Sequence, residues 1–348
     1  MILKRKNRTK KGMNSLKFAF SLLGFFILTL SVWFLGNIFL LQGDEVEDVI
    51  FSVKEGDGLS RVSFALEKEG LIASKTAFAL WGLISNKQRC LMAGDYELSP
   101  EMTSFNILKY LTTPGQAKKV LIFEGWSTED IAQHFAEKEM FFQDDFLNTC
   151  SDKGVAFFKD EFPFLANLPK ESTLEGFLFP DSYELSKLDS PQRVVRKMLL
   201  NFQAKVLENE KVNIEKQLES KEITLFEALT MASLIEKEVK SYQDKQIVSG
   251  ILWKRLRNGW PLQVDATLVY LTGKVALNSH KEIDSLYNTY KNKGLPPGPI
   301  CNPGFESILA ALNPETSAYW YYLSTKTGQI IFSKTLDEHN INRGKYLR

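Results

Sequence analysis

Residues 18–41 read Phe-Ala-Phe-Ser-Leu-Leu-Gly-Phe-Phe-Ile-Leu-Thr-Leu-Ser-Val-Trp-Phe-Leu-Gly-Asn-Ile-Phe-Leu-Leu and contain no charged side chain. As a helix rising about 1.5 Å per residue, this segment would extend about 36 Å, enough to cross a hydrocarbon core of about 30 Å. The segment decides the architecture, because it separates a short tail from the rest of the chain. The sequence therefore predicts one membrane-spanning helix over residues 18–41.

The charges on the two sides of this segment predict its orientation. Residues 1–41 carry seven Lys and Arg and no acid, whereas four acids lie within residues 44–48. The positive-inside rule places the N-terminus in the cytoplasm and residues 42–348 outside, on a single-pass protein of the inner (cytoplasmic) membrane. A cleaved signal peptide is the alternative, but its apolar region would span about 7–15 residues and end in small residues. The sequence Phe39-Leu40-Leu41-Gln42 offers no such site, which favours an uncleaved anchor.

The composition excludes several classes of protein. Beyond the basic tail the chain holds 36 Lys and Arg against 42 Asp and Glu, and this acidic body argues against a nucleic-acid partner. Three widely spaced cysteines exclude a disulfide scaffold and a Cys-only zinc site, and three histidines do not suggest a His-rich centre. We therefore expect neither a metal nor another cofactor.

Local patterns predict a mixture of short strands and helices. Residues 49–66 have the pattern of a strand, a turn and a helix, which returns at 120–135. A long amphipathic helix is expected over 191–219, further helices over 224–239 and 246–257, and a hairpin over 319–332. Pro114-Gly115 marks a boundary near residue 116. The predicted parts are a basic tail (1–17), the span (18–41), a small subdomain (42–115) and a larger domain (116–348).

Three segments, at 174–184, 231–238 and 262–298, combine acids, amides, glycines and aromatic residues. Acids and amides can bind sugar hydroxyls while aromatic rings cover the apolar faces of sugars, so this chemistry suits a glycan-binding cleft. The sequence lacks the motifs of serine hydrolases, P-loop NTPases and zinc proteases. His339 is typical of a surface histidine and is not a candidate.

The helix expected at 224–239 carries two candidate acids. On a helical wheel Glu236 falls inside the apolar arc and Glu238 at its edge. A carboxyl in apolar surroundings has a raised pKa and can act as the general acid for glycosidic cleavage. The wheel alone favours Glu236 as the more buried acid. Alternatively, one or both acids only form ion pairs or cap neighbouring elements.

Several motifs follow one another in the order found in one family of enzymes. They are Glu124-Gly125-Trp126, Leu174-Glu175-Gly176, Phe179-Pro180-Asp181-Ser182-Tyr183, Ala232-Ser233-Leu234-Ile235-Glu236-Lys237-Glu238, Leu262-Gln263-x-Asp265-x-Thr267, Tyr287-Asn288-Thr289-Tyr290, Gly294-Leu295-Pro296-Pro297-Gly298-Pro299-Ile300 and Asn302-Pro303-Gly304. Over residues 50–345 the chain resembles the endolytic murein transglycosylase (YceG-like) family. Residues 53–60 also resemble the opening of a LysM module, a peptidoglycan-binding unit.

The resemblance implies an α+β fold, with one transmembrane helix, a small LysM-like α/β subdomain and a larger α+β catalytic domain. It assigns catalysis to one acid, Glu238, against the preference of the wheel. The substrate-binding candidates are Glu175, Asp181, Gln263, Asp265, Asn288 and Tyr290, each with a structural role in turns or sheets as the alternative. The chain departs from the family pattern at Val239, where Thr or Ser is usual, and at Val264 and Ala266 within the usual Gln-Thr-Asp-Pro-Thr.

The implied activity is that of a peptidoglycan lytic transglycosylase. Such an enzyme cleaves the bond between N-acetylmuramic acid and N-acetylglucosamine within nascent glycan strands, leaves 1,6-anhydro ends and terminates strand elongation. The implied partners are glycan strands, the cytoplasmic membrane, penicillin-binding proteins and the elongation machinery. Two alternatives stay open: a non-catalytic, LysM-like wall-binding scaffold for peptidoglycan synthases, and a hydrolase that produces reducing ends.

Overall fold

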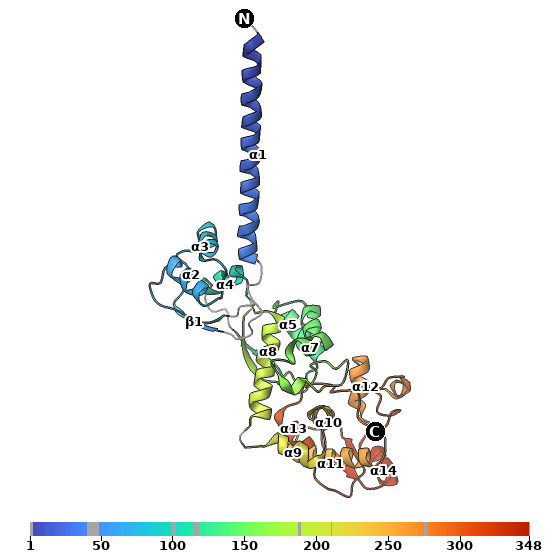
Figure 1. Cartoon of the computed structure of the whole chain (residues 1–348). Coiled ribbons are helices and arrows are strands. Elements are labelled where there is room, and N and C mark those ends of the chain that lie inside the picture. Colours follow the sequence, from blue (N-terminus) through green and yellow to red (C-terminus); the bar gives the residue numbers. More distant parts are fainter. Residues whose placement is uncertain are drawn as a thin grey trace. The chain divides into compact units, whose positions relative to one another are not determined.

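The computed structural model describes residues 3–39, 49–98, 102–113, 118–186, 189–209, 211–274 and 277–347. The chain combines helices with short antiparallel strands and divides into two compact units, Met1–Gln116 and Ala117–Arg348 (Figure 1). The expected mixture of helix and strand is confirmed.

The first element is one long helix, α1 (Leu3–Phe39). Its segment Ser21–Phe39 has a mean hydropathy of 2.0 and is long and apolar enough to cross a membrane. The polar side chains inside it bond to the helix itself: Thr29 donates to the Phe26 carbonyl at 2.9 Å and Asn37 to the Trp33 carbonyl at 2.8 Å. This internal satisfaction is what a polar group in an apolar environment requires. Leu40 and Leu41 of the predicted span lie outside the described residues.

The rest of the first unit is a small α/β arrangement. Strand β1 (Val49–Val53) pairs antiparallel with β2 (Gly94–Leu98), and the helices are α2 (Leu59–Lys68), α3 (Lys75–Ile84) and α4 (Ser104–Leu111). The predicted strand, turn and helix at 49–66 are therefore confirmed. Buried side chains from every element of this arrangement, among them Phe51, Leu66, Phe78, Leu98 and Ile107, form one core.

The second unit contains two antiparallel strand pairs and most of the helices. Strand β3 (Lys118–Leu121) pairs antiparallel with β4 (Ser182–Leu185), and β5 (Tyr321–Ser324) with β6 (Ile330–Ser333). In chain order, its first helices are α5 (Thr128–Glu137), α6 (Gln143–Thr149), α7 (Asp152–Phe158), η1 (Pro163–Leu165), α8 (Pro191–Phe202), η2 (Gln203–Leu207) and α9 (Ile214–Lys221). Those that follow are α10 (Leu225–Glu238), α11 (Tyr242–Arg257), α12 (Asp265–Thr272), η3 (Asn278–Glu282), α13 (Phe305–Leu312) and α14 (Leu336–Tyr346).

The prediction of one long helix over 191–219 is wrong. Helix α8 ends at Phe202 and passes into the wider turn η2, and α9 begins only at Ile214. The Asn213 side chain caps α9 by accepting the Lys216 N–H at 2.9 Å. Asn favours such cap positions because its side chain competes with the helical backbone bonds. The apolar periodicity continued through this break, and for that reason it concealed the end of α8.

Helix α10 lies at the centre of the second unit. It begins at a capping box between Thr224 and Glu227, and its residues 228–235 are all buried. It packs against α11, α12 and α13. The chain turns to an extended conformation at Val239, where φ is −145°, so the helix ends at Glu238. A helix held on so many sides keeps its last residue in a fixed position.

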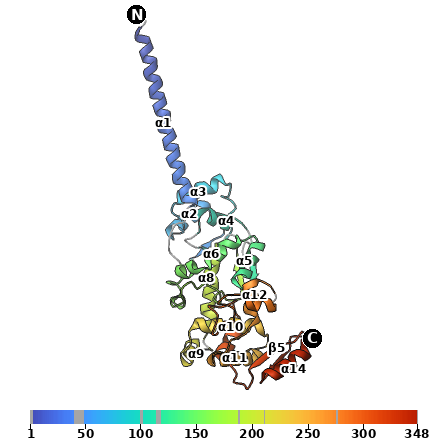
Figure 2. The same ribbon diagram turned by 90° about the vertical axis from the view of Figure 1, so that its right-hand side faces the viewer.

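The C-terminal hairpin and helix form a separate wall of this unit. Strands β5 and β6 confirm the predicted hairpin, and α14 packs on both strands (Figure 2). The periodicity of the sequence did not predict α14. None of its residues is fully buried, so it carries no apolar stripe by which a sequence pattern could have identified it.

Candidate active site

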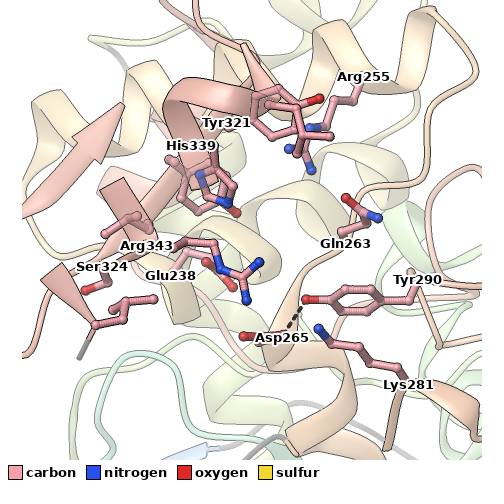
Figure 3. A pocket seen from close by; sticks show the side chains of 14 residues that line it. Glu238, Arg255, Gln263, Asp265, Lys281, Tyr290, Tyr321, Ser324, His339 and Arg343 are labelled. Carbon is pink, nitrogen blue, oxygen red and sulfur yellow. Dashed lines mark hydrogen bonds between the residues drawn. The ribbon is translucent and has the colours of Figure 1, made fainter. Parts of the chain in front are cut away.

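A pocket of about 580 Å³ opens at the C-terminal end of α10 (Figure 3). It is bounded by α10, α11, the loops on either side of α12, the β5–β6 hairpin and α14. Its lining residues are Glu238, Arg255, Gln263, Asp265, Lys281, Tyr290, Tyr321, Tyr322, Leu323, Ser324, Leu336, His339, Arg343 and Leu347. Four of the predicted site residues, Glu238, Gln263, Asp265 and Tyr290, therefore meet in one pocket although the sequence separates them by up to 52 positions.

The Glu238 carboxyl has an environment that favours its protonated form. Loss of hydration and the negative charge of Asp265 raise its pKa to about 7, against the opposing effect of hydrogen bonds from the Tyr322 hydroxyl and the Ala266 N–H. Its place at the C-terminal end of α10 adds to the preference for the neutral form, because the negative end of the helix dipole lies there. An acid with a pKa near neutrality can donate a proton and take one back.

Asp265 and Tyr290 form the opposite side of the pocket. The Tyr290 hydroxyl donates a hydrogen bond of 2.5 Å to the Asp265 carboxylate (Figure 3). Asp265 is the first residue of α12, where the helix dipole favours a negative charge. The pocket thus holds two carboxyls in different environments: that of Glu238 is desolvated, and that of Asp265 is hydrogen-bonded at the start of α12.

A strained loop presents Gln263 to the pocket. Its φ is +56°, which is uncommon for a residue with a side chain, while Leu262 and Val264 on either side are buried. The Gln263 N–H donates to the Thr289 carbonyl at 3.0 Å, and the Val264 N–H donates to the Thr289 hydroxyl at 3.0 Å. These bonds hold the backbone so that the exposed Gln263 amide lies at the pocket.

Sequence reasoning missed the basic residues of the pocket. Arg255 donates to the Trp320 carbonyl at 2.9 Å and to the Leu262 carbonyl at 2.7 Å, so it ties α11 to the hairpin and to the Gln263 loop. His339 was set aside as a surface residue, but it lines the pocket and stacks on the Tyr321 ring at 5.2 Å. Lys281 and Arg343 also line the pocket. The one indication available in the sequence was Arg255, which falls at helical spacing after Val248 and Leu252 on the helix predicted at 246–257.

The other three predicted site residues lie elsewhere and are bonded to the chain itself. Glu175 is buried, accepts the Thr128 N–H at 3.0 Å and the Asn302 side-chain amide at 2.9 Å, and lines a separate pocket. Asp181 accepts a hydrogen bond from Asn201 at 2.9 Å and pairs with Lys205. None of these three residues lines the pocket of Glu238.

Asn288, the third of them, is fully buried beneath the pocket wall. Its amide donates to the carbonyls of Lys281 and Ile283 at 3.0 and 2.8 Å, and its oxygen accepts the Tyr290 N–H at 3.0 Å. These bonds fix the loop that carries both Lys281 and Tyr290. Asn288 therefore acts on the pocket through two residues that line it.

Three of the sequence motifs converge on a buried cluster around Asn302, here named the Asn302 cluster (Trp126, Glu175, Gly176, Asn302). The Asn302 side chain accepts the Gly176 N–H at 2.9 Å and donates to the Trp126 carbonyl at 3.1 Å as well as to Glu175. Gly176 has a φ of +90°, and a Cβ there would meet Pro299 at 2.6 Å. The density of polar residues in these motifs thus reflects a buried network, which borders the second pocket, of about 770 Å³, through Glu175.

The two residues before Glu238 attach the end of α10 to its surroundings. Glu236 accepts the Gly304 N–H at 3.0 Å and pairs with Lys245 at 3.4 Å, and Lys237 donates to the Gly125 carbonyl at 2.8 Å. Glu236 does not line the pocket. The ion-pair role considered for one of the two acids thus applies to Glu236.

Comparisons with known proteins identify the family of the chain. Residues 51–345 match the model of the YceG-like family. A protein from Bacillus subtilis named endolytic murein transglycosylase is 32% identical over 88% of this chain and 87% of its own length. Proteins of the same name from two strains of Streptococcus pneumoniae are 26% identical over 90% of this chain, which spans 61% of their length. A crystal structure of a YceG-like protein from Listeria monocytogenes has a TM-score of 0.59, with 33% identity and coverage of 86% of this chain and 100% of that one.

Proposed function

Because this chain belongs to the YceG-like family, we propose that it is a peptidoglycan lytic transglycosylase that cleaves glycan strands internally and leaves 1,6-anhydromuramoyl ends. Cleavage of nascent strands in this way would terminate their elongation. The observation that carries the proposal is the Glu238 carboxyl, which has a pKa of about 7 and faces a pocket that is open to solvent.

In the proposed reaction Glu238 acts first as acid and then as base. The protonated carboxyl donates its proton to the oxygen that links C1 of N-acetylmuramic acid to the next sugar, and the C1–O bond breaks. The resulting carboxylate takes the proton of the muramoyl 6-hydroxyl as that oxygen bonds to C1. No water is consumed, and Glu238 ends protonated and ready for another cycle. The bonds from Tyr322 and Ala266 stabilise the intermediate carboxylate.

Residues around Glu238 have the chemistry to hold the sugars. Gln263, Asp265 and Tyr290 would bind hydroxyl and acetamido groups directly, and the Tyr290 and Tyr321 rings would cover apolar sugar faces. Glu175, Asp181 and Asn288, whose polar atoms already bond to the chain, would support the fold around the site. Glu238 is the proposed catalytic residue.

A hydrolase is the second candidate, since the charge of Asp265 acts on Glu238. Hydrolysing glycosidases commonly use two carboxyls, of which one activates a water or attacks the sugar. If Asp265 did so, the products would carry reducing ends. The match to the YceG-like family, with relatives named endolytic murein transglycosylase, favours the transglycosylase.

Mass spectrometry of the products tests both candidates. Purified glycan strands are incubated with the full chain in detergent, and the ends of the fragments are weighed. Anhydro ends, lighter by one water than reducing ends, are the expected result. Reducing ends would identify a hydrolase, and intact strands would leave the wall-binding scaffold as the better explanation.

We also propose that α1 anchors the protein in the cytoplasmic membrane with residues 42–348 outside. The proposal is supported by the apolar segment Ser21–Phe39 and by the basic residues before it. A reporter fused after Arg348 should be active only outside the cytoplasm. Protection of the body from protease added to spheroplasts would contradict this topology.

The remaining proposals concern residues 42–115. We propose that this subdomain is LysM-like, binds glycan without chemistry, and brings the enzyme near penicillin-binding proteins and the elongation machinery. Support comes from residues 53–60, which span the end of β1, the turn and the start of α2. Substitutions on the exposed side of this turn should weaken retention on insoluble sacculi while cleavage of short soluble strands persists. Unchanged retention would count against the assignment.

A further inference from the structure

We propose that Lys281 and Arg343 form an anion-binding site in the wall of the Glu238 pocket, and that it recognises a carboxylate of the peptide stem carried by N-acetylmuramic acid. The inference rests on the proposed function and extends it, because it makes the enzyme selective for strands that bear peptides. While the lactyl carboxyls are held in amide bonds to the peptides, the glycan backbone itself is neutral and would not call for these charges.

Among the residues that the structure describes, Arg343 has no partner of opposite charge. It lies on α14, its side chain is exposed, and Figure 3 shows it turned into the pocket. Its guanidinium makes no hydrogen bond or ion pair with any residue that the structure describes. The acids at the start of the same helix, Asp337 and Glu338, precede Arg343 by six and five positions, whereas side chains on one helix meet at a spacing of three or four. Glu338 also accepts the Lys334 N–H at 2.7 Å. A guanidinium with free donors suits a planar oxyanion such as a carboxylate.

Lys281 supplies a second positive charge to the same pocket. Its ammonium lies 4.5 Å from the centre of the Tyr290 ring, and it forms no ion pair with the acids in the described part of the chain. The nearby Asp265 bonds to the Tyr290 hydroxyl. Asn288 accordingly holds a loop that places both a sugar-facing ring and a cation at the pocket.

The total charge of the pocket points to an anionic ligand. Arg255, Lys281 and Arg343 carry three positive charges, and Glu238 and Asp265 are the acids among the lining residues. In the proposed mechanism Glu238 starts out neutral, which leaves an excess of two positive charges. The pKa of His339 is lowered by burial and by the charges of Arg343 and Arg255, and its imidazole supplies no negative charge that could offset this excess. This field would attract an anion into the pocket.

Peptidoglycan offers two oxyanions of similar chemistry. Stem peptides carry carboxylates and hang from the lactyl group of the sugar whose C1 is attacked, whereas a pyrophosphate occurs only at the lipid-linked end of a nascent strand. Cleavage within the strand takes place away from that end. The geometry of internal cleavage therefore favours the peptide carboxylate.

The test compares kcat/KM of the full chain on three lipid-free substrates: strands with peptides, strands whose peptide carboxylates have been converted to neutral amides, and strands stripped by an amidase, which carry the freed lactyl carboxylate on each N-acetylmuramic acid. Lipid-linked strands with pyrophosphate form a fourth arm. The unmutated chain should prefer strands with free carboxylates. Arg343→Gln and Lys281→Gln should each reduce the ratio of kcat/KM on strands with free peptide carboxylates to that on strands with neutral peptide amides by about tenfold, mainly through KM.

Lys345→Gln is the matched control, because it removes a positive charge from the same helix at a residue outside the pocket lining. It should leave the ratio unchanged. An unaltered ratio in both pocket variants, or an equal fall in the control, would overturn the proposal. A loss confined to lipid-linked strands would overturn the carboxylate assignment in favour of pyrophosphate.

Binding measurements separate this proposal from the proposed function. In chains that also carry Glu238→Gln, the affinity for peptide-bearing strands is measured without turnover. Weaker binding on Arg343→Gln supports the anion site even if the products of the unmutated chain are not anhydro ends. Equal binding of strands with free and with amidated peptide carboxylates by the Glu238→Gln chain overturns it even if cleavage proceeds as proposed.

Discussion

The pocket of Glu238 and the Asn302 cluster each hold a glutamate whose pKa burial raises to about 7. In the cluster, the Glu175 carboxyl is bonded by the Thr128 N–H and the Asn302 amide, and it holds the start of α5 in place. In the pocket, the Glu238 carboxyl faces an open space lined by tyrosines, an amide and basic residues.

The difference teaches that a raised pKa does not by itself identify a catalytic acid. Desolvation produces the same shift in a structural network as in an active site. Both glutamates line a pocket. They differ in their neighbours, because Glu175 is bonded by Thr128 and Asn302, whereas the pocket of Glu238 also collects several of the other candidate groups. The following predictions test this comparison.

The largest effect is expected for Glu238→Gln. The amide keeps the shape and most hydrogen bonds but cannot donate a proton as a carboxylic acid does. General acid–base catalysis contributes about 10²–10⁴-fold, and because Glu238 would serve in both steps the loss of kcat should reach the upper end. Kinetics on purified strands provide the measurement, with strand binding as the check on folding. Normal cleavage by this variant would show that Glu238 is not the catalytic acid.

The pH dependence of cleavage should follow the ionisation of Glu238. Its raised pKa means that the proton-donating form predominates below about pH 7 and declines above it. We expect kcat/KM to fall about tenfold per pH unit once the pH exceeds that pKa. A rate that stays level from pH 6 to pH 9 would be incompatible with Glu238 as the acid.

Glu236→Gln should affect stability more than chemistry. The substitution removes the charge that pairs with Lys245, which is buried, and it weakens the bond to the Gly304 N–H. Leaving a buried charge without its partner costs about 3 kcal/mol or more, and the retained amide oxygen should lower that cost. Denaturant unfolding gives the free energy. If Glu236→Gln instead abolishes cleavage in a chain of normal stability, the helical wheel was right about the acid.

Glu175→Gln should reduce the free energy of unfolding by about 1–3 kcal/mol near pH 5, since an amide NH₂ would face the N–H donors of Thr128 or Asn302. The pKa of Glu175 is raised from 4.5 to about 7, so its stabilising effect is complete below pH 4.5 and is lost as the pH rises to about 7. The difference in stability between variant and parent should therefore shrink at pH 8. A large loss of kcat without a loss of stability would give Glu175 a role in the chemistry.

Much of the local structure could be predicted because it depends on local patterns. The apolar run before residue 40, the strand and helix at 49–66, and helix α10 with its Thr224 cap all arise from neighbouring residues. The break after Phe202 was not predicted because the apolar pattern of the sequence continues through it. Helix α14 was not predicted because it has no apolar pattern.

The sequence by itself determined the apolar segment near the N-terminus, the family motifs and the presence of two acids at the end of one helix. It could not decide between Glu236 and Glu238 by burial, because that depends on which groups other segments bring to each carboxyl. Only the tertiary structure placed Gly304 and Lys245 at Glu236 and an open pocket at Glu238. The same holds for Arg343, about 100 residues further along, which reaches the pocket only because α14 packs on the hairpin.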